Sequence, residues 1–117
     1  MTTAPTLQSL IADRWIGSSA AAALKSAVNG KTVYHTHSEG IDFAEALHHA
    51  RTTGGPALLA LDFQQRAARL KALAAYLIEH KEKLYPVSAH TGATRADGWV
   101  DIEGGAGTLF AYASVGA

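Results

Sequence analysis

The sequence contains no cysteine, carries no net charge and has no long apolar run. Without cysteine, the chain cannot form disulfides, thiolate metal sites or a cysteine nucleophile. Zero net charge gives no electrostatic basis for binding nucleic acid or an anionic membrane surface. No apolar run reaches the roughly 18–20 residues that a membrane-spanning helix requires. The first ten residues lack the basic start and apolar centre of a secretory signal, so we expect a cytoplasmic protein.

Phenylalanine and tryptophan are also scarce, with 3 Phe and 2 Trp among 117 residues. Apolar residues make up 48% of the chain, but many of them are alanine. Alanine carries little apolar area, so a core built on it is thin. The length fits one small domain. We expect the rest of the chain to supply only part of the surface that its helices need.

The strongest pattern is a helix predicted over 62–79. Asp62 and Gln65 have the spacing of a capping box. No Gly or Pro interrupts the run, and apolar residues recur at the spacing of one helix face. The members of this stripe are Phe63, Ala67, Leu70, Ala74 and Leu77.

The other elements predict an α+β fold that is mostly helical. We expect residues 1–6 to be disordered, a short strand to end at Gly17, and a hairpin at about 24–37 around Asn29-Gly30 within a hairpin region of about 7–37. Further helices are predicted at about 42–53, 82–91 and 94–116. The first of these should end at the pair of glycines before Pro56, and Pro86 is tolerable only in a first turn.

Candidate chemistry is sparse. His35 and His37 share one face of a predicted strand and could reach one metal ion, but solvated histidines are the better interpretation. The run 104–108, Gly-Gly-Ala-Gly-Thr, resembles a phosphate loop in composition only, and helix packing explains its glycines better. Asp97, Asp101 and Glu103 could form a carboxylate pair, although a solvated face is the simpler interpretation. We therefore assign no catalytic, cofactor-binding or metal-binding residue.

The order of several weak motifs resembles the aldehyde dehydrogenase superfamily from about residue 7 onward. Residues 11–17 are similar to its "I-x-G-x-W-x" opening, and 41–46 to its "V-D-x-A-V-x-A-A" helix. Residues 66–74 resemble "R-A-x-x-L-x-x-L-A", 90–93 stand where the family has "E-T-G-K", and 109–113 resemble "L-x-Y-Y-A". Residues 88–105 are most similar to the bifunctional branch in phenylacetate degradation, which carries an enoyl-CoA hydratase domain (oxepin-CoA hydrolase). Ring-cleavage members of the benzoyl-CoA route are the alternative.

This resemblance implies that residues 7–117 are an N-terminal fragment of an aldehyde dehydrogenase domain, with a partial fold and no activity alone. The family's catalytic Cys, general-base Glu, oxyanion Asn and nicotinamide-binding glycines have no counterpart here. The resemblance implies that the full-length relative would use NADP to oxidise a CoA-linked semialdehyde. It also implies that this relative would be a homo-oligomer. The partner of this chain would be the remainder of that domain. Phe110 and Tyr112 would line the substrate tunnel.

Two other hypotheses remain. The chain could be a free-standing helical module that pairs its apolar stripes with a partner or with itself, without catalysis. Such a module would form a defined oligomer and unfold cooperatively. A His/Asp metalloenzyme is a remote third hypothesis, because it would need a stoichiometric metal ion.

Overall fold

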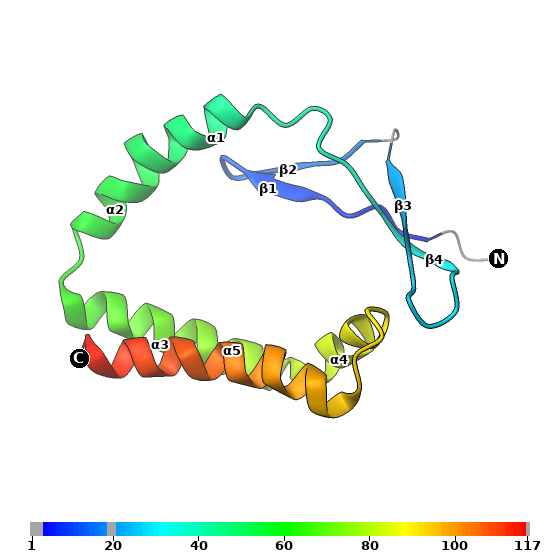
Figure 1. The fold of residues 1–117 in the computed structure, drawn as a ribbon. Helices are drawn as coiled ribbons and strands as arrows, with labels where there is room; N and C mark the ends of the chain where they lie inside the picture. The colour runs from blue at the N-terminus through cyan, green and yellow to red at the C-terminus, as the bar shows by residue number, and fades with distance from the viewer. Residues whose placement is uncertain (1–3, 19–20, 117) are drawn as a thin grey trace. The chain divides into compact units, whose positions relative to one another are not determined.

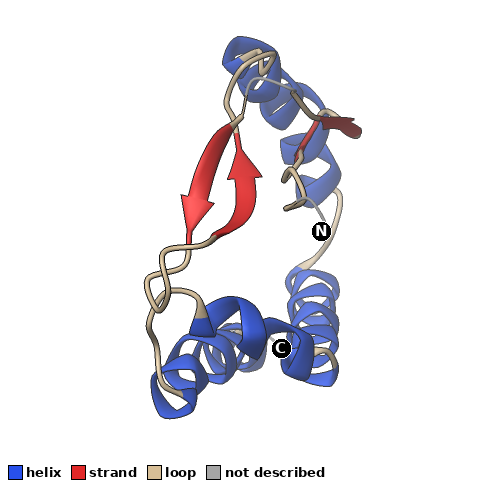
Figure 2. Ribbon diagram, turned by 90° about the vertical axis from the view of Figure 1, so that its right-hand side faces the viewer, coloured by secondary structure: helices blue, strands red, loops and turns tan. Residues whose placement is uncertain are grey.

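The computed structural model describes residues 4–18 and 21–116, and in this part strands come first and helices follow (Figure 1, Figure 2). It confirms the predicted α+β fold with mostly helical content. The chain divides into two compact units, residues 1–57 and 58–117. None of the described helices is long and apolar enough to cross a membrane.

The first unit contains two antiparallel hairpins rather than the one expected. Strands β1 (Ser9–Ile11) and β2 (Arg14–Ile16) pair with Leu10 opposite Trp15. Ala12 and Asp13 form the turn between them with φ of 47° and 61°. Two positive φ values in succession are those of a type I′ turn, which matches the twist of a hairpin. The sequence did not predict this hairpin because neither residue is a glycine or an asparagine.

The second hairpin joins β3 (Ala22–Lys25) to β4 (Thr32–Thr36), close to the predicted range. Its turn differs from the expected two-residue type. The amide of Gly30 donates to the carbonyl of Ser26 at 2.8 Å, and only Gly30 in this loop has positive φ. The loop therefore spans Ser26 to Lys31, and the register shifts between Leu24 and Lys25.

The predicted disorder of residues 1–6 is wrong for Pro5 and Thr6, whereas residues 1–3 lie outside the described part. The amide of His35 donates to the carbonyl of Pro5 at 2.9 Å, and the amide of Leu7 donates to the carbonyl of His35 at 2.8 Å. Thr6 thus forms an isolated parallel β-bridge with His35 of β4. Backbone hydrogen bonding to a strand holds this segment in place.

The helix predicted at 42–53 does not stop at its glycines. Helix α1 (Phe43–His49) continues into a π-helical turn at Ala50–Gly54 and then into α2 (Gly55–Leu59). The amide of Gly55 donates to the carbonyl of Ala50, five residues back. Pro56 has no amide to donate and its ring crowds the preceding turn. A wider turn accommodates the proline without ending the helix.

The second unit is a helical assembly in which α3 (Phe63–Glu79) and α5 (Arg95–Val115) lie side by side (Figure 1). They run antiparallel, because Gly116 lies near Ala67 and the carbonyl of Phe63. Both helices begin with a capping box, at Asp62 as predicted and at Thr94.

Alanines form most of the core of this unit. The buried apolar residues are Ala67, Ala74, Tyr85, Ala106 and Ala113. Small side chains let two helix backbones approach closely, but they bury little area. The expected stripe on α3 is wrong at Phe63, whose side chain is 75% exposed. Its backbone lies near the end of α5, but its side chain at the first turn of α3 stays on the surface.

Helix α4 (Lys81–Ala89) follows α3 after a break at a single residue, His80, and so begins one residue before the range predicted at about 82–91. Pro86 lies in the interior of α4, not in its first turn as predicted. The chain then turns at Gly92, with φ of 89°, and enters α5. Gly98 of α5 packs against α4, where an added Cβ would lie 3.1 Å from Ser88 Oγ and 3.3 Å from the ring of Tyr85.

Candidate functional site

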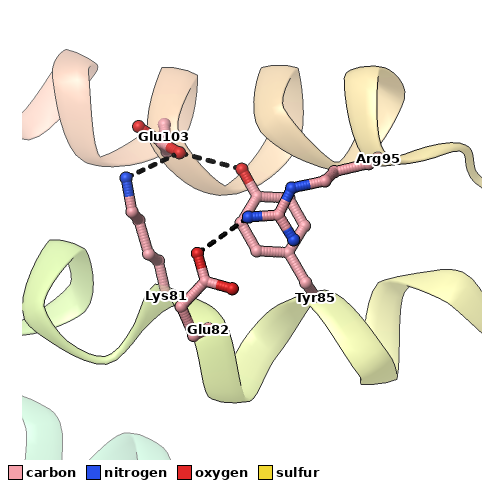
Figure 3. A network of polar contacts seen from close by, with 5 residues as sticks. All are labelled: Lys81, Glu82, Tyr85, Arg95 and Glu103. Atoms are coloured by element: carbon pink, nitrogen blue, oxygen red, sulfur yellow. Dashed lines mark hydrogen bonds and ion pairs between the residues drawn. The ribbon is translucent and has the colours of Figure 1, made fainter.

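Charged and polar side chains from α4 and α5 meet in one cluster, shown in Figure 3. We name it the α4–α5 polar cluster; its members are Lys81, Glu82, Tyr85, Arg95 and Glu103. Glu103 Oε1 accepts from the Tyr85 hydroxyl at 2.8 Å and from Lys81 Nζ at 3.1 Å. Arg95 donates to Glu82 Oε1 at 2.8 Å. The Arg95 guanidinium also lies 4.1 Å from the centroid of the Tyr85 ring, in the geometry of a cation–π contact.

The helices explain this geometry. Lys81 and Tyr85 are four residues apart on α4 and therefore share a face. Gly98 lets α5 approach that face closely, which places Glu103 opposite both donors. The sequence expectation of a solvated Glu103 is wrong, because its side chain is only 21% exposed.

Within the cluster, the pKa values of Tyr85 and Glu103 shift in the directions that favour the hydrogen bond between them. Burial and the hydrogen bond to Glu103 raise the pKa of Tyr85. The hydrogen bonds from Tyr85 and Lys81 lower the pKa of Glu103. The ionised Glu103 carboxylate and the neutral Tyr85 phenol are the forms that make this hydrogen bond. The cluster therefore ties α4 to α5.

A surface groove of about 290 Å³ adjoins the cluster between α4 and the start of α5. The residues that line it are Glu82, Tyr85, Pro86, Ala89, Ala93, Thr94 and Arg95.

Asp97 does not serve as half of a carboxylate pair. It completes the cap of α5, and the hydrogen bonds with Thr94 lower its pKa.

A second groove of about 430 Å³ lies between α3 and α5, and we name it the α3–α5 groove. Its lining is mostly apolar and consists of Gln64, Ala67, Ala68, Lys71, Phe110, Ala113 and Ser114. Phe110 belongs to this lining, whereas Tyr112 does not. Phe110 and Tyr112 are two residues apart, which corresponds to a rotation of about 200° around the helix axis. Their side chains therefore leave α5 on opposite sides. The structure therefore does not bring the two proposed tunnel residues together.

The run 104–108 does not form a phosphate cradle. All five residues lie within α5, and the Thr108 hydroxyl donates to the carbonyl of Gly104 at 3.1 Å. A cradle for a nucleotide phosphate needs free amides at the turn before a helix, so these residues do not fit NADP. The described residues do not supply the backbone against which these glycines were expected to pack. An added Cβ at Gly104, Gly105 or Gly107 would meet nothing within 4 Å among the described residues.

The histidines considered as metal ligands lie within hydrogen-bonding distance of backbone carbonyls instead. His35 Nδ1 lies 3.3 Å from the carbonyl of Ala4, and His37 Nδ1 lies 3.2 Å from that of Glu39. In the described residues, no three His, Cys, Asp or Glu side chains are placed to share a metal ion. Within the first unit, Arg14 of the β1–β2 hairpin pairs with Glu45 of α1.

Many large apolar side chains lie on the surface of both units. The most exposed are Trp15, Val28, Leu59, Phe63, Tyr112 and Val115. Scattered apolar residues are normal on protein surfaces, but so many beside a core of alanine are unusual. The pattern is typical of a surface that a further protein segment covers.

Comparison with known proteins supports a dehydrogenase relationship. No family model matches the chain. The chain is 38% identical over 112 residues to a 3,4-dehydroadipyl-CoA semialdehyde dehydrogenase from Aromatoleum evansii. The aligned part is 94% of this chain but only 22% of that enzyme. The chain thus spans about a fifth of the length of the relative that it matches, and it is similar to part of a dehydrogenase for a CoA-linked semialdehyde.

Proposed function

We propose that this chain is the N-terminal part of a dehydrogenase that oxidises a CoA-linked semialdehyde, with NADP as the electron acceptor. The observation that carries the proposal is the 38% identity over nearly the whole chain to a semialdehyde dehydrogenase. Two features support a scaffold role for the segment. The α4–α5 polar cluster holds two helices together, and the large exposed apolar residues suit burial against the rest of such an enzyme.

The finer assignment is also a proposal. A role in phenylacetate degradation follows from the resemblance of residues 88–105, and the benzoyl-CoA route remains the alternative. In the complete enzyme, we propose a cytoplasmic homo-oligomer in which the remainder of the domain supplies the catalytic cysteine and the nicotinamide site.

A chimera tests the scaffold role. The matched 112 residues of the Aromatoleum evansii enzyme are replaced by this chain, and reduction of NADP by 3,4-dehydroadipyl-CoA semialdehyde is followed spectrophotometrically. We expect a soluble chimera with the parental oligomer size and activity within about tenfold of the parent, a loss of up to roughly 1.4 kcal/mol in transition-state stabilisation. The same enzyme with the segment deleted is the control, and it should be inactive. An inactive chimera of parental size would contradict the proposal.

Phe110 and Tyr112 remain our proposed tunnel residues, and the chimera can separate them. Because they leave α5 on opposite sides, only one can face the substrate directly. We expect one of the variants Phe110→Ala and Tyr112→Ala to raise KM for the semialdehyde while the other leaves it unchanged. Equal KM values for the parent chimera and both variants would remove both residues from the tunnel.

A further inference from the structure

Asn29 and Gly30 lie exposed in the loop between β3 and β4. Asn29 is the only asparagine in the sequence. Gly30 has φ of +70°, and a Cβ added there would meet nothing within 4 Å. The dipeptide is therefore accessible to water and free of steric cover from other described residues. Its exposure matters because asparagine followed by glycine is a chemically labile pair.

The lability comes from attack by the backbone nitrogen of the glycine on the side-chain amide carbon of the asparagine. A bond forms between Gly30 N and Asn29 Cγ, and the bond from Cγ to Nδ2 breaks. Ammonia leaves, carrying the proton that the Gly30 amide lost, and a five-membered succinimide remains. Water then opens the ring at either carbonyl, giving aspartate or isoaspartate. No oxidant, reductant or enzyme is needed.

The loop engages both reacting groups. The Gly30 amide, which must lose its proton to attack, donates to the carbonyl of Ser26 at 2.8 Å. Asn29 Oδ1 accepts from the amide of Lys31 at 3.0 Å, which fixes the side chain in a local turn. We propose that Asn29 is a self-modification site whose deamidation the folded Ser26–Lys31 loop holds back. Opening of the loop releases the nucleophile and the side chain together.

The product would alter the hairpin in a defined way. Isoaspartate inserts an extra carbon into the main chain between residues 29 and 30. The Gly30 amide could then no longer reach the Ser26 carbonyl in the present loop geometry, and the closing bond from Ser26 to the Lys31 carbonyl, at 2.9 Å, would be strained. Either product also adds a negative charge to a chain whose net charge is zero. The modification would therefore hinder reclosure of a loop that had opened.

Intact-mass spectrometry of the full chain tests the proposal, because no other asparagine contributes to the signal. The chain is incubated at one pH and temperature in native buffer and in urea, with Asn29→Gln as the control. We expect the mass gain of deamidation in both, roughly fivefold faster in urea, the factor that loss of one hydrogen bond predicts. The control should gain no mass on that timescale. Absence of a mass gain in urea, or equal rates in the two conditions, would overturn the proposal.

Discussion

The Tyr85 hydroxyl joins α4 to α5. It donates to Glu103 at 2.8 Å, a shorter hydrogen bond than the 3.1 Å one from Lys81 to the same carboxylate. We expect Tyr85→Phe to lower the thermal unfolding midpoint slightly, by the effect of one hydrogen bond to a charged acceptor. Tyr76→Phe is a matched control, because the Tyr76 side chain is 58% exposed on α3. Circular dichroism melts that show equal losses for both variants would contradict this role.

The hydrogen-bonded pair of Tyr85 and Glu103 predicts how the stability of the fold depends on pH. The pKa of Glu103 is lowered on folding, so its contribution is present above its ordinary value of 4.5 and is lost as pH falls through the folded value. The pKa of Tyr85 is raised, so its contribution is present below its ordinary value of 10.0 and is lost as pH rises through the folded value. Midpoints should therefore plateau between these limits and fall on both sides. In Tyr85→Phe the alkaline decline should shrink, and an unchanged alkaline profile would count against the assignment.

At the scale of the elements, the contact between α3 and α5 depends on alanine. Ala74 is fully buried where these helices pack, whereas its neighbour Ala75 is exposed. We expect Ala74→Leu to destabilise the second unit by about 1–3 kcal/mol, because the added atoms must push the helices apart. Ala75→Leu adds the same side chain without that clash and should change the urea midpoint little. Similar effects from both variants would show that α3 does not pack on α5 through Ala74.

The cap of α3 gives a second prediction for an element. Asp62 accepts from the Gln65 amide at 2.7 Å, and Gln65 Oε1 accepts from the Asp62 amide at 3.0 Å. Asp62→Ala removes the first bond and should cost about 1 kcal/mol of stability. Asp62→Asn keeps an acceptor at the same position and should stay close to the parent in chemical denaturation. A loss from Asn as large as that from Ala would mean that charge, not the cap, is what stabilises the helix.

The elements that could be predicted from the sequence are those set by neighbouring residues. The α3 cap follows from Asp62 and Gln65, and the β3–β4 hairpin from Asn29-Gly30 flanked by strand formers. The turn at Ala12-Asp13 was missed because positive φ values are usually signalled by glycine or asparagine, and neither residue is present there. The candidate site was missed for a different reason. Glu103 meets Tyr85 and Lys81 only because Gly98 lets two helices approach, and no local pattern specifies that contact.

At the scale of the whole molecule, exposed apolar surface is the property that separates the two leading hypotheses. A segment of a larger dehydrogenase should bind a hydrophobic dye such as ANS strongly when it is alone, because Phe63, Tyr112 and Val115 lack cover from the other described residues. The same residues within the chimera should be buried, so dye fluorescence per chain should fall to the level of the parent enzyme. An independent module predicts the reverse: little dye bound by the isolated chain, a defined oligomer in size-exclusion chromatography and one sharp melt.

Dye binding that stays high in an active chimera would mean that these residues remain exposed in the complete enzyme. The segment would then contribute through its polar cluster rather than through its apolar surface.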